Sequence, residues 1–264
     1  MENKSAKYYT LITGANAGIG KQIAFECAGK GFNLLLVSLP NTGLDKLAEE
    51  IKEKYQVEAD YIDIDLTKIE APQMVFDYTR NNNIKVNILV NNAGVGFNGK
   101  FENLTTDLVD QMILLNIRAS TLLTFLFLPE MKKLAKAYIL NISSFGAFVP
   151  LPYKCVYAAT KSYLLFLTRA LNIELKGTNV QVTSIHPSGV SSERAINNIR
   201  KSSLIARIST LSPENVAHIA VKKMISGEKV VVPGIVTKFY YYLGSVLPHG
   251  FVVRMVGYVF RKTS

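Results

Sequence analysis

A tyrosine and a lysine, Tyr157 and Lys161, lie four residues apart in the segment CVYAATKSY. Residues with this spacing share one face of a helix, so the phenol and the ammonium group could reach the same point in space. A free tyrosine has a pKa of about 10, and a cation beside it would lower that pKa and make the phenol an effective acid or base near neutrality. Helix surfaces carry many such pairs, so the rest of the chain decides whether this pair transfers protons.

A glycine-rich segment, LITGANAGIGKQIA, follows the first apolar run and places Gly14, Gly18 and Gly20 before a helical pattern. Glycine permits a tight turn and lets a pyrophosphate approach the backbone, and the N-terminus of a helix offers free N–H groups to an anion. The segment predicts a dinucleotide site. The alternative is a glycine-rich turn that binds nothing.

Apolar runs that are typical of strands alternate with helical patterns as far as residue 235. The runs are YYTLITG, FNLLLVS, VEADYIDID, VNILVNNAG, AYILNISS, VQVTSIHP and KVVVP. They are nearly continuous in hydrophobicity, as expected for parallel strands whose two faces are both covered. The alternation predicts an α/β fold of Rossmann type, a doubly wound parallel sheet of about seven strands with helices on both faces. We expect one domain over residues 1–264.

The composition, with 48% apolar and 19% charged residues, indicates a globular protein with a proper core. Cys27 and Cys155 show no metal-ligand spacing, and His186, His218 and His249 stand alone, so we predict no metal. The N-terminus lacks the apolar region of a secretory signal, and no stretch offers the roughly 18 uncharged apolar residues of a clear membrane span. We therefore predict a cytoplasmic protein with reduced thiols.

The spacing of Gly14, Gly18 and Gly20, with Thr13 before them, resembles the short-chain dehydrogenase/reductase family. The resemblance continues through NNAG at residues 91–94, DIDLT with its Asp65–Leu66 pair, LLNIRAS around Asn116, and Ser144 thirteen residues before Tyr157. The motifs cover about residues 8 to 235 in the family's order. Within the family, the chain is similar to the 17-beta-hydroxysteroid dehydrogenase and long-chain 3-oxoacyl reductase members.

The segment HPSGVSS after the sixth apolar run matches the family's Pro-Gly segment only loosely. Ser188 takes the place of the usual glycine, and Ser192 replaces the customary threonine. Val190 would give backbone hydrogen bonds to a nicotinamide carboxamide. This departure weakens the assignment of the loop and leaves Tyr157 and Lys161 unaffected.

The resemblance implies hydride transfer between a nicotinamide and a carbonyl or alcohol carbon. The implied catalytic residues are Asn116, Ser144, Tyr157 and Lys161. Tyr157 would carry the proton, Ser144 would donate a hydrogen bond to the substrate oxygen, and Lys161 would lower the Tyr157 pKa and hold the nicotinamide ribose. Asn116 would hold a water that connects Lys161 to solvent. Ser143 is the alternative to Ser144, and His186 is interpreted as structural.

A protein of the same fold that binds NADP as a sensor or scaffold, without significant turnover, is the alternative function. Such a protein would be expected to lose the serine, the tyrosine or the lysine. This chain keeps Ser144, Tyr157 and Lys161. The sequence therefore favours the enzyme.

The resemblance also implies the cofactor contacts, which are Gly14, Asn16, Gly18, Ile19, Gly20, Ser38, Asp65, Leu66, Asn92, Ala93, Gly94, Tyr157, Lys161, Pro187, Val190 and Ser192. An acidic residue at the end of the second strand would favour NAD by binding the ribose 2′-hydroxyl. This chain has Val37, Ser38 and Leu39 there, so the charge argument favours NADP(H) over NAD(H). Lys21 and Lys46 are candidate cations for the 2′-phosphate.

The residues that follow Ser144 are Phe145, Ala147, Phe148, Val149, Leu151 and Tyr153, where the family walls its substrate pocket. We therefore expect a hydrophobic carbonyl or alcohol substrate, such as a ketone, a steroid or a 3-oxoacyl thioester. The alternative is that these side chains only pack under a lid. The helical segments STLLTFLFLP and KSYLLFLTRALNIEL are apolar on most of their circumference, and the family pairs such helices, so we predict a homodimer or homotetramer.

The C-terminal third is basic: residues 189–264 hold eleven Lys and Arg against three Glu, which gives +8 of the net charge of +10. Such an excess can serve nucleic acid, an anionic membrane surface or plain solvation, and no nucleic-acid recognition motif is present. We predict a substrate lid over residues 190–212 and an apolar basic extension over residues 235–264. The extension is expected to be helical and to cover the active-site side, with peripheral membrane attachment as a secondary hypothesis.

Overall fold

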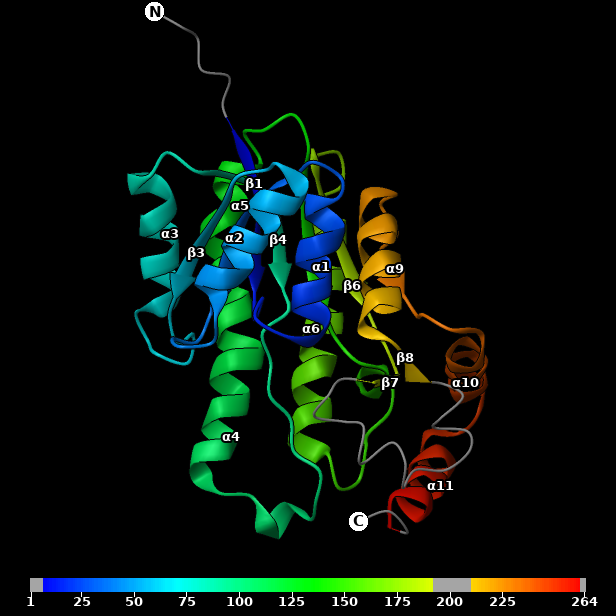
Figure 1. Ribbon diagram of the computed structural model, residues 1–264. Coiled ribbons are helices and arrows are strands. Elements are labelled where there is room, and N and C mark those ends of the chain that lie inside the picture. Colours follow the sequence, from blue (N-terminus) through cyan, green and yellow to red (C-terminus); the bar gives the residue numbers. More distant parts are fainter. Residues whose placement is uncertain (1–6, 192–209, 262–264) are drawn as a thin grey trace, which may run out of the picture.

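A seven-stranded parallel sheet forms the centre of the computed structural model, which describes residues 7–191 and 210–261 (Figure 1). The strands are β1 (Tyr8–Thr13), β2 (Asn33–Ser38), β3 (Ala59–Asp63), β4 (Lys85–Asn91), β5 (Ala137–Ile142), β6 (Val180–Ile185) and β9 (Val230–Val231). Their order across the sheet is β3-β2-β1-β4-β5-β6-β9. Each apolar run of the sequence forms one of these strands, so the predicted fold class and single domain are confirmed.

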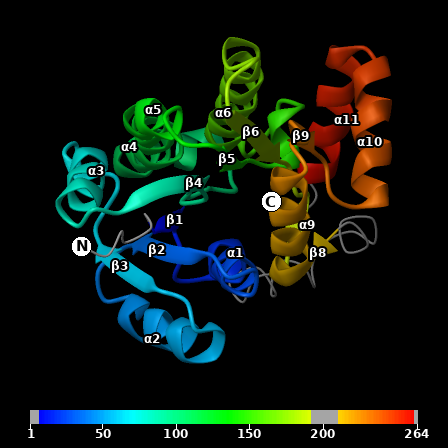
Figure 2. The same cartoon turned by 90° about the horizontal axis from the view of Figure 1, so that it is seen from above.

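Helices cover both faces of the sheet (Figure 2). One face carries α1 (Gly18–Ala28), α2 (Leu44–Tyr55) and α9 (Pro213–Ile225), and the other carries α3 (Ala71–Asn81), α5 (Ser120–Met131) and α6 (Cys155–Glu174). Successive strand residues point to opposite faces, so Leu34 and Leu36 enter the first core while Leu35 and Val37 enter the second. This two-sided burial explains why the strands have no polar alternation.

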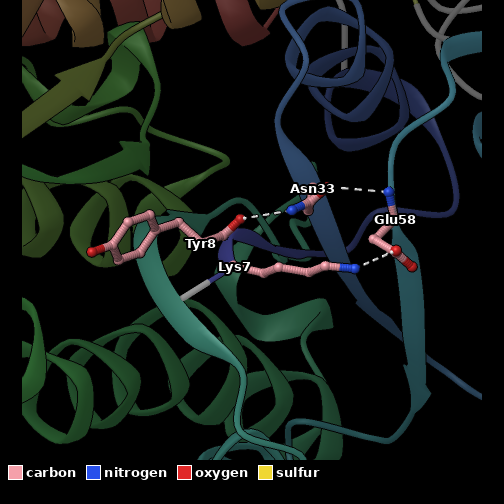
Figure 3. A network of polar contacts seen from close by, with 4 residues as sticks. All are labelled: Lys7, Tyr8, Asn33 and Glu58. Atoms are coloured by element: carbon pink, nitrogen blue, oxygen red, sulfur yellow. Dashed lines mark hydrogen bonds and ion pairs between the residues drawn. The ribbon is translucent and has the colours of Figure 1, made fainter. Parts of the chain in front are cut away.

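The N-terminal ends of β1, β2 and β3 are held together by polar side chains (Figure 3). Asn33 Nδ2 donates to the Tyr8 carbonyl at 3.3 Å, and Asn33 Oδ1 accepts from the Glu58 N–H at 3.1 Å. Lys7 and Glu58 form an ion pair at 2.6 Å between exposed side chains. These contacts stabilise the end of the sheet opposite to the glycine-rich loop.

A long helix runs from Thr106 to Met131 and consists of α4 (Thr106–Ile113), a π-helical turn η2 (Leu114–Ala119) and α5. Among the described residues it is the one helix long and apolar enough to cross a membrane. Its side chains Leu123, Phe127 and Met131 are buried in the core, which is the ordinary place of such a helix in this fold. The π turn contains Asn116, and such turns are frequent at functional sites.

Two helices end the chain, α10 (Ile235–Val246) and α11 (His249–Arg261), and they lie side by side at the end of the sheet away from β3 (Figures 1 and 2). Before them, β7 (Gly189–Val190) and β8 (Thr210–Leu211) pair in parallel. Residues 192–209, most of the predicted lid, lie outside the described residues.

Candidate active site

The predicted site residues converge at the carboxyl ends of the parallel strands. The chain order reverses between the neighbours β1 and β4, and in such sheets the loops on either side of the reversal leave in opposite directions and form a crevice. Apart from Tyr157 and Lys161 of α6, the predicted cofactor contacts lie at the carboxyl ends of β1, β2, β3, β4 and β6 or in the segments that follow these strands, which include the start of α1 and β7. Ser192 lies outside the described residues. The crevice is therefore built from segments far apart in the sequence.

The glycine-rich loop after β1 has the backbone that its sequence predicts. Gly14 and Gly18 have φ values of +64° and +55°, in the left-handed region that favours glycine. A Cβ at Gly20 would lie 2.2 Å from the Gly14 carbonyl oxygen and 2.4 Å from Asn92 Nδ2, so only glycine fits there. Asn92 Nδ2 fixes the loop by donating to the carbonyls of Thr13 and Gly14 at 2.8 and 3.0 Å.

The N-terminus of α1 has the features of an anion site. Ala17 stands at the N-cap position and has no side-chain oxygen to accept the first N–H groups of the helix. A Cβ built at Gly18 would meet no atom within 4 Å, so space is open in front of this turn. Free N–H groups, a positive dipole end and open space fit a dinucleotide pyrophosphate.

The ends of β2 and β3 supply the remaining predicted cofactor contacts on this side. Ser38 Oγ donates to Asn16 Oδ1 at 2.7 Å, which joins the end of β2 to the glycine-rich loop. The Asp65 carboxylate accepts from the N–H and Oγ1 of Thr67 at 2.9 and 2.8 Å, so it shapes its own turn. Leu66 is buried in the core.

Lys161 is buried, and its charge has no carboxylate partner among the described residues. Its Nζ donates to the Ile142 carbonyl at 2.9 Å and lies 5.8 Å from the centre of the Tyr157 ring. Burial lowers the pKa of Lys161 to about 8. The lysine thus stands one helical turn from the tyrosine, on the same face of α6, as the sequence predicts.

Burial raises the pKa of Tyr157, and a hydrogen bond with Ser144 lowers it by a smaller amount. In the chain alone the pKa of Tyr157 therefore lies above its ordinary value, and the lowering by Lys161 stays a prediction. The physical reason is that desolvation of the phenolate outweighs every other influence, while the ammonium group is directed at the Ile142 carbonyl. The phenol therefore keeps its proton at neutral pH.

The two serines after β5 have different partners, and this separates Ser144 from its alternative. Ser143 Oγ donates to the Lys161 carbonyl at 2.9 Å and is thereby committed to the backbone of α6. Ser144 Oγ accepts from the Gly146 N–H at 3.2 Å, and the Ser144 side chain is near enough to Tyr157 to lower the pKa of the phenol. Ser144, and not Ser143, is the serine that acts on the tyrosine.

Asn116 connects three segments from inside the π turn. Its Oδ1 accepts from the Val95 N–H at 2.9 Å, and its Nδ2 donates to the Val95 carbonyl at 2.9 Å and to Thr160 Oγ1 at 3.0 Å. A Cβ at Gly94 would lie 3.1 Å from Asn116 Oδ1 and 3.2 Å from Lys161 Nζ. Asn116 and Lys161 therefore flank the same point beside the loop after β4.

Two residues that the sequence interpretation did not assign to the site contact its members. His186 is fully buried, with Nδ1 3.1 Å from the Ser144 carbonyl oxygen and Nε2 2.8 Å from Ser184 Oγ. Gly96 lies against the Tyr157 ring, because a Cβ there would come within 2.9 Å of a ring carbon. The motif NNAG at residues 91–94 ends before Gly96, and nothing local in the sequence marks His186 as a partner of Ser144.

The surroundings of Tyr157 are mostly apolar. A narrow gap beside it is lined by Phe97, Gly99, Leu104, Met112, Tyr153, Lys154, Cys155 and Val156. Of the residues expected to wall the pocket, Ala147 and Val149 are buried in the packing, whereas Phe145, Phe148, Leu151 and Tyr153 are half-buried. Phe148 stacks on His186 with ring centres 4.5 Å apart and meets Tyr241 of α10 at 4.6 Å.

Comparison with known proteins gives one consistent result. The family model described as short chain dehydrogenase matches residues 9–202. The very-long-chain 3-oxoacyl-CoA reductase of Homo sapiens is 33% identical over 222 residues, which cover 81% of this chain and 67% of that protein. The hydroxysteroid dehydrogenase-like protein 1 of Gallus gallus is 35% identical over 182 residues, which cover 68% of this chain and 54% of that protein. The matched part thus spans about half to two thirds of these relatives.

Solved structures share the fold over most of the chain. The bulky-bulky ketone specific alcohol dehydrogenase from Comamonas testosteroni has a TM-score of 0.78 at 28% identity, over 91% of this chain and 92% of that one. A short-chain dehydrogenase from Sphingobium yanoikuyae, solved in complex with NADPH, has a TM-score of 0.75 at 26% identity, over 92% of this chain and 96% of that one. Both similarities extend beyond the glycine-rich loop to the whole sheet.

Proposed function

We propose, from the premise that this chain belongs to the short chain dehydrogenase family, that it is an NAD(P)(H)-dependent oxidoreductase acting on a carbonyl or alcohol group. The observation that carries the proposal is that Ser144, Tyr157 and Lys161 meet at the carboxyl end of β5, where Ser144 lowers the pKa of Tyr157 and Lys161 Nζ lies 5.8 Å from the centre of the Tyr157 ring. The open turn at Gly18 and the N-terminus of α1 support nucleotide binding. The catalytic residues are Asn116, Ser144, Tyr157 and Lys161.

In this reaction the side chains of the protein transfer the proton and stabilise the charge on the substrate oxygen. A bound nicotinamide supplies or accepts the hydride. The Tyr157 phenol, which is protonated at neutral pH, donates a proton to the carbonyl oxygen in the reduction direction. Ser144 Oγ donates a hydrogen bond to the same oxygen and stabilises the charge that develops on it. Lys161 would hold the nicotinamide ribose, and Asn116, which fixes the loop beside Lys161, would hold the water that connects Lys161 to solvent.

NADP(H) is the cofactor that we favour over NAD(H). No carboxylate stands at Ser38 or Leu39, so a 2′-phosphate at the end of β2 would meet no like charge there. The solved relative from Sphingobium yanoikuyae binds NADPH, which supports this preference. Of the two candidate cations, Lys21 lies over the Phe25 ring at 5.6 Å and Lys46 is exposed on α2.

Replacement of Leu39 by Asp tests the cofactor preference. The unaltered protein should bind NADPH more tightly than NADH by fluorescence titration, and Leu39→Asp should reverse the order because the new carboxylate repels the 2′-phosphate and accepts a bond from a 2′-hydroxyl. Leu39 is exposed, so the fold should tolerate the change. Tighter binding of NADH by the unaltered protein would refute the preference.

The substrate that fits the site is a hydrophobic carbonyl compound or the corresponding alcohol. Most side chains that line the narrow gap beside Tyr157 are apolar, and Phe145 and Phe148, which follow Ser144 in the chain, have ring centres 6.0 Å apart. The names of the relatives point to ketones, hydroxysteroids and 3-oxoacyl thioesters. Residues 190–212 would form the lid over the bound substrate.

A substrate screen tests the activity itself. Bulky ketones, oxosteroids and long-chain 3-oxoacyl thioesters are incubated with NADPH and with NADH, and nicotinamide absorbance is followed. We expect turnover with at least one hydrophobic class and none with small polar sugars. Tight NADPH binding without turnover of any class would instead support the sensor or scaffold.

Assembly and location complete the proposal. α5 and α6 expose Phe125, Phe166 and Ile173, and Thr121 of α5 bonds Tyr163 of α6 at 3.0 Å. These neighbouring helices would pair with a second copy in a homodimer or homotetramer. We place the protein in the cytoplasm, with residues 235–264 as the segment that could bring it to a membrane.

A further inference from the structure

The C-terminal helices α10 and α11 each bury one face against the domain. On α10, Thr237 is buried and bonds Ser188 Oγ at 3.1 Å, and Tyr241 packs on Phe148. On α11, Val252 is buried, and the backbone at Gly257 approaches Pro152, since a Cβ there would lie 3.3 Å from the proline ring. The tail is therefore docked beside the catalytic serine and not free in solution.

The opposite face of each helix is apolar and exposed. On α10, Ile235, Phe239 and Tyr242 have exposed fractions of 88%, 62% and 64%. On α11, Phe251 and Tyr258 are 57% and 63% exposed, with Met255 between them. In both helices these residues stand at positions i, i+4 and i+7, which share one face. Exposed aromatic side chains that gather on two adjacent helices are typical of a surface that binds a partner or a membrane.

Each of these exposed apolar faces also carries a cationic side chain, at the same position in both helices. Lys238 and Arg254 are exposed, and each stands three residues after the first apolar residue of its helix, Ile235 or Phe251. Five Lys and Arg and no Asp or Glu follow Glu228 in the sequence. Aromatic and aliphatic side chains flanked by cations are the pattern of a helix that lies in the interface of an anionic bilayer.

We infer that the exposed faces of α10 and α11, here called the tail surface, bind the surface of an anionic lipid membrane. The aromatic side chains would enter the head-group region, and Lys238 and Arg254 would meet lipid phosphates. The helices have 12 and 13 residues, about 20 Å each at about 1.5 Å per residue, which is too short to span a core of about 30 Å. The contact is therefore peripheral.

A second copy of the chain is the competing occupant of the tail surface. A two-fold interface pairs a surface with itself, so Lys238 and Arg254 would face like charges without an acidic residue from either tail. An anionic lipid surface provides the complementary charge that a second copy lacks. The contact would also set the active-site side of the domain against the membrane, where a hydrophobic substrate accumulates; this consequence alone rests on the proposed function.

Vesicle co-sedimentation of the full-length protein tests the inference independently of turnover. Binding to vesicles of phosphatidylcholine that contain about one third phosphatidylglycerol is compared with binding to vesicles of phosphatidylcholine alone, at low and at high salt. We expect binding to the anionic vesicles that falls several-fold at high salt. Two results at low salt would overturn the inference: no sedimentation with either vesicle type, or equal sedimentation with both.

Matched variants assign the binding to the tail surface. The pair Lys238→Glu and Arg254→Glu should reduce binding about tenfold or more, because each reversal removes an attraction and adds a repulsion. The pair Phe239→Ser and Tyr242→Ser should reduce it through loss of apolar insertion. The control pair Lys132→Glu and Lys176→Glu makes the same charge change at exposed positions elsewhere and should bind within twofold of the unaltered protein.

The outcome of these variants decides between the two occupants. Equal losses in the tail and control pairs would mean that only net charge matters, which overturns the assignment. Light scattering measures the size of the assembly formed by each variant. If the tail variants form smaller assemblies and the unaltered protein does not bind anionic vesicles, the tail surface is an interface between copies and the inference fails. Thermal unfolding of every variant confirms that the fold is retained, and an inactive but membrane-binding protein would leave the inference intact while refuting the proposed function.

Discussion

At the scale of single residues, burial shifts the pKa values of three side chains in the site in the direction that favours their uncharged forms. Lys161 has its pKa lowered to about 8, His186 has its pKa lowered to about 4, and Tyr157 has its pKa raised, in each case chiefly through burial. His186 is therefore neutral, and because the Ser144 carbonyl can only accept, Nδ1 carries the proton and Nε2 accepts from Ser184. The imidazole thus joins the Ser144 carbonyl to Ser184 Oγ.

The pKa of His186 predicts a dependence of stability on pH. Between pH 6.5 and about 4 the unfolded chain binds a proton at this side chain and the folded chain does not, so the free energy of unfolding falls as pH decreases through this window. At 1.36 kcal/mol per unit, the loss is about 3 kcal/mol. His186→Gln removes the titrating group, so its urea-unfolding curves at pH 7.5 and 4 should differ by that much less than those of the unaltered protein. The same pH dependence in both proteins would show that His186 is not the group responsible.

At the scale of elements, the long helix from Thr106 to Met131 and the helix α6 hold the loop after β4 between them. The π turn lets Asn116 bond both polar groups of Val95, and Gly94 and Gly96 let the loop approach Lys161 and Tyr157. The loop, the long helix, Tyr157 and Lys161 thus form one packed unit. A side chain added at Gly96 would push directly on the Tyr157 ring.

Gly96→Ala tests this packing. The new methyl group would come within 2.9 Å of the Tyr157 ring, so the ring must shift, and a displacement of less than 1 Å at a catalytic group costs on the order of tenfold to a hundredfold in kcat. The KM for the substrate and the melting temperature should change less. Gly250→Ala serves as the control, because a Cβ at Gly250 would lie within 4 Å of no other atom. Gly43→Ala would be unsuitable, because the backbone φ of Gly43 is +78° and an alanine there would be strained. Full activity of Gly96→Ala would show that the loop is not in contact with the working tyrosine.

At the scale of the whole molecule, exposed aromatic side chains of the described residues lie on α5 and α6 and on the tail surface of α10 and α11. The surface on α5 and α6 has the features of a subunit interface, because Phe125 and Phe166 are 70% and 66% exposed on helices that neighbour each other. Apolar side chains of this size in a contiguous patch are typical of interfaces between subunits.

Phe125→Glu combined with Phe166→Glu tests this assignment. A charge placed at the centre of an apolar interface has no partner there, so we expect the oligomer to dissociate to monomers in light scattering and sedimentation. Vesicle binding by the tail surface should remain. An unchanged oligomer would move the subunit contact to another face.

The sequence predicts much of this account because the informative patterns are local. The seven strands follow from continuous apolar runs, and Tyr157, Lys161 and Ser144 follow from their spacing. Contacts between distant segments leave no such pattern: the bond from His186 to the Ser144 carbonyl crosses 42 residues, and the packing of Gly96 on Tyr157 joins a loop to a helix. The sequence also does not predict that the pKa of Tyr157 is raised, because desolvation depends on how deeply the folded chain buries the phenol.

The central claim is that Tyr157 is the proton donor of a nicotinamide-dependent reductase, and turnover of Tyr157→Phe measures it most directly. The change removes one oxygen and keeps the ring that packs against Gly96. With NADPH and a hydrophobic ketone or 3-oxoacyl thioester that the unaltered protein reduces, kcat should fall about a hundredfold or more, while the Kd for NADPH stays within a few-fold. Turnover close to that of the unaltered protein would contradict the claim.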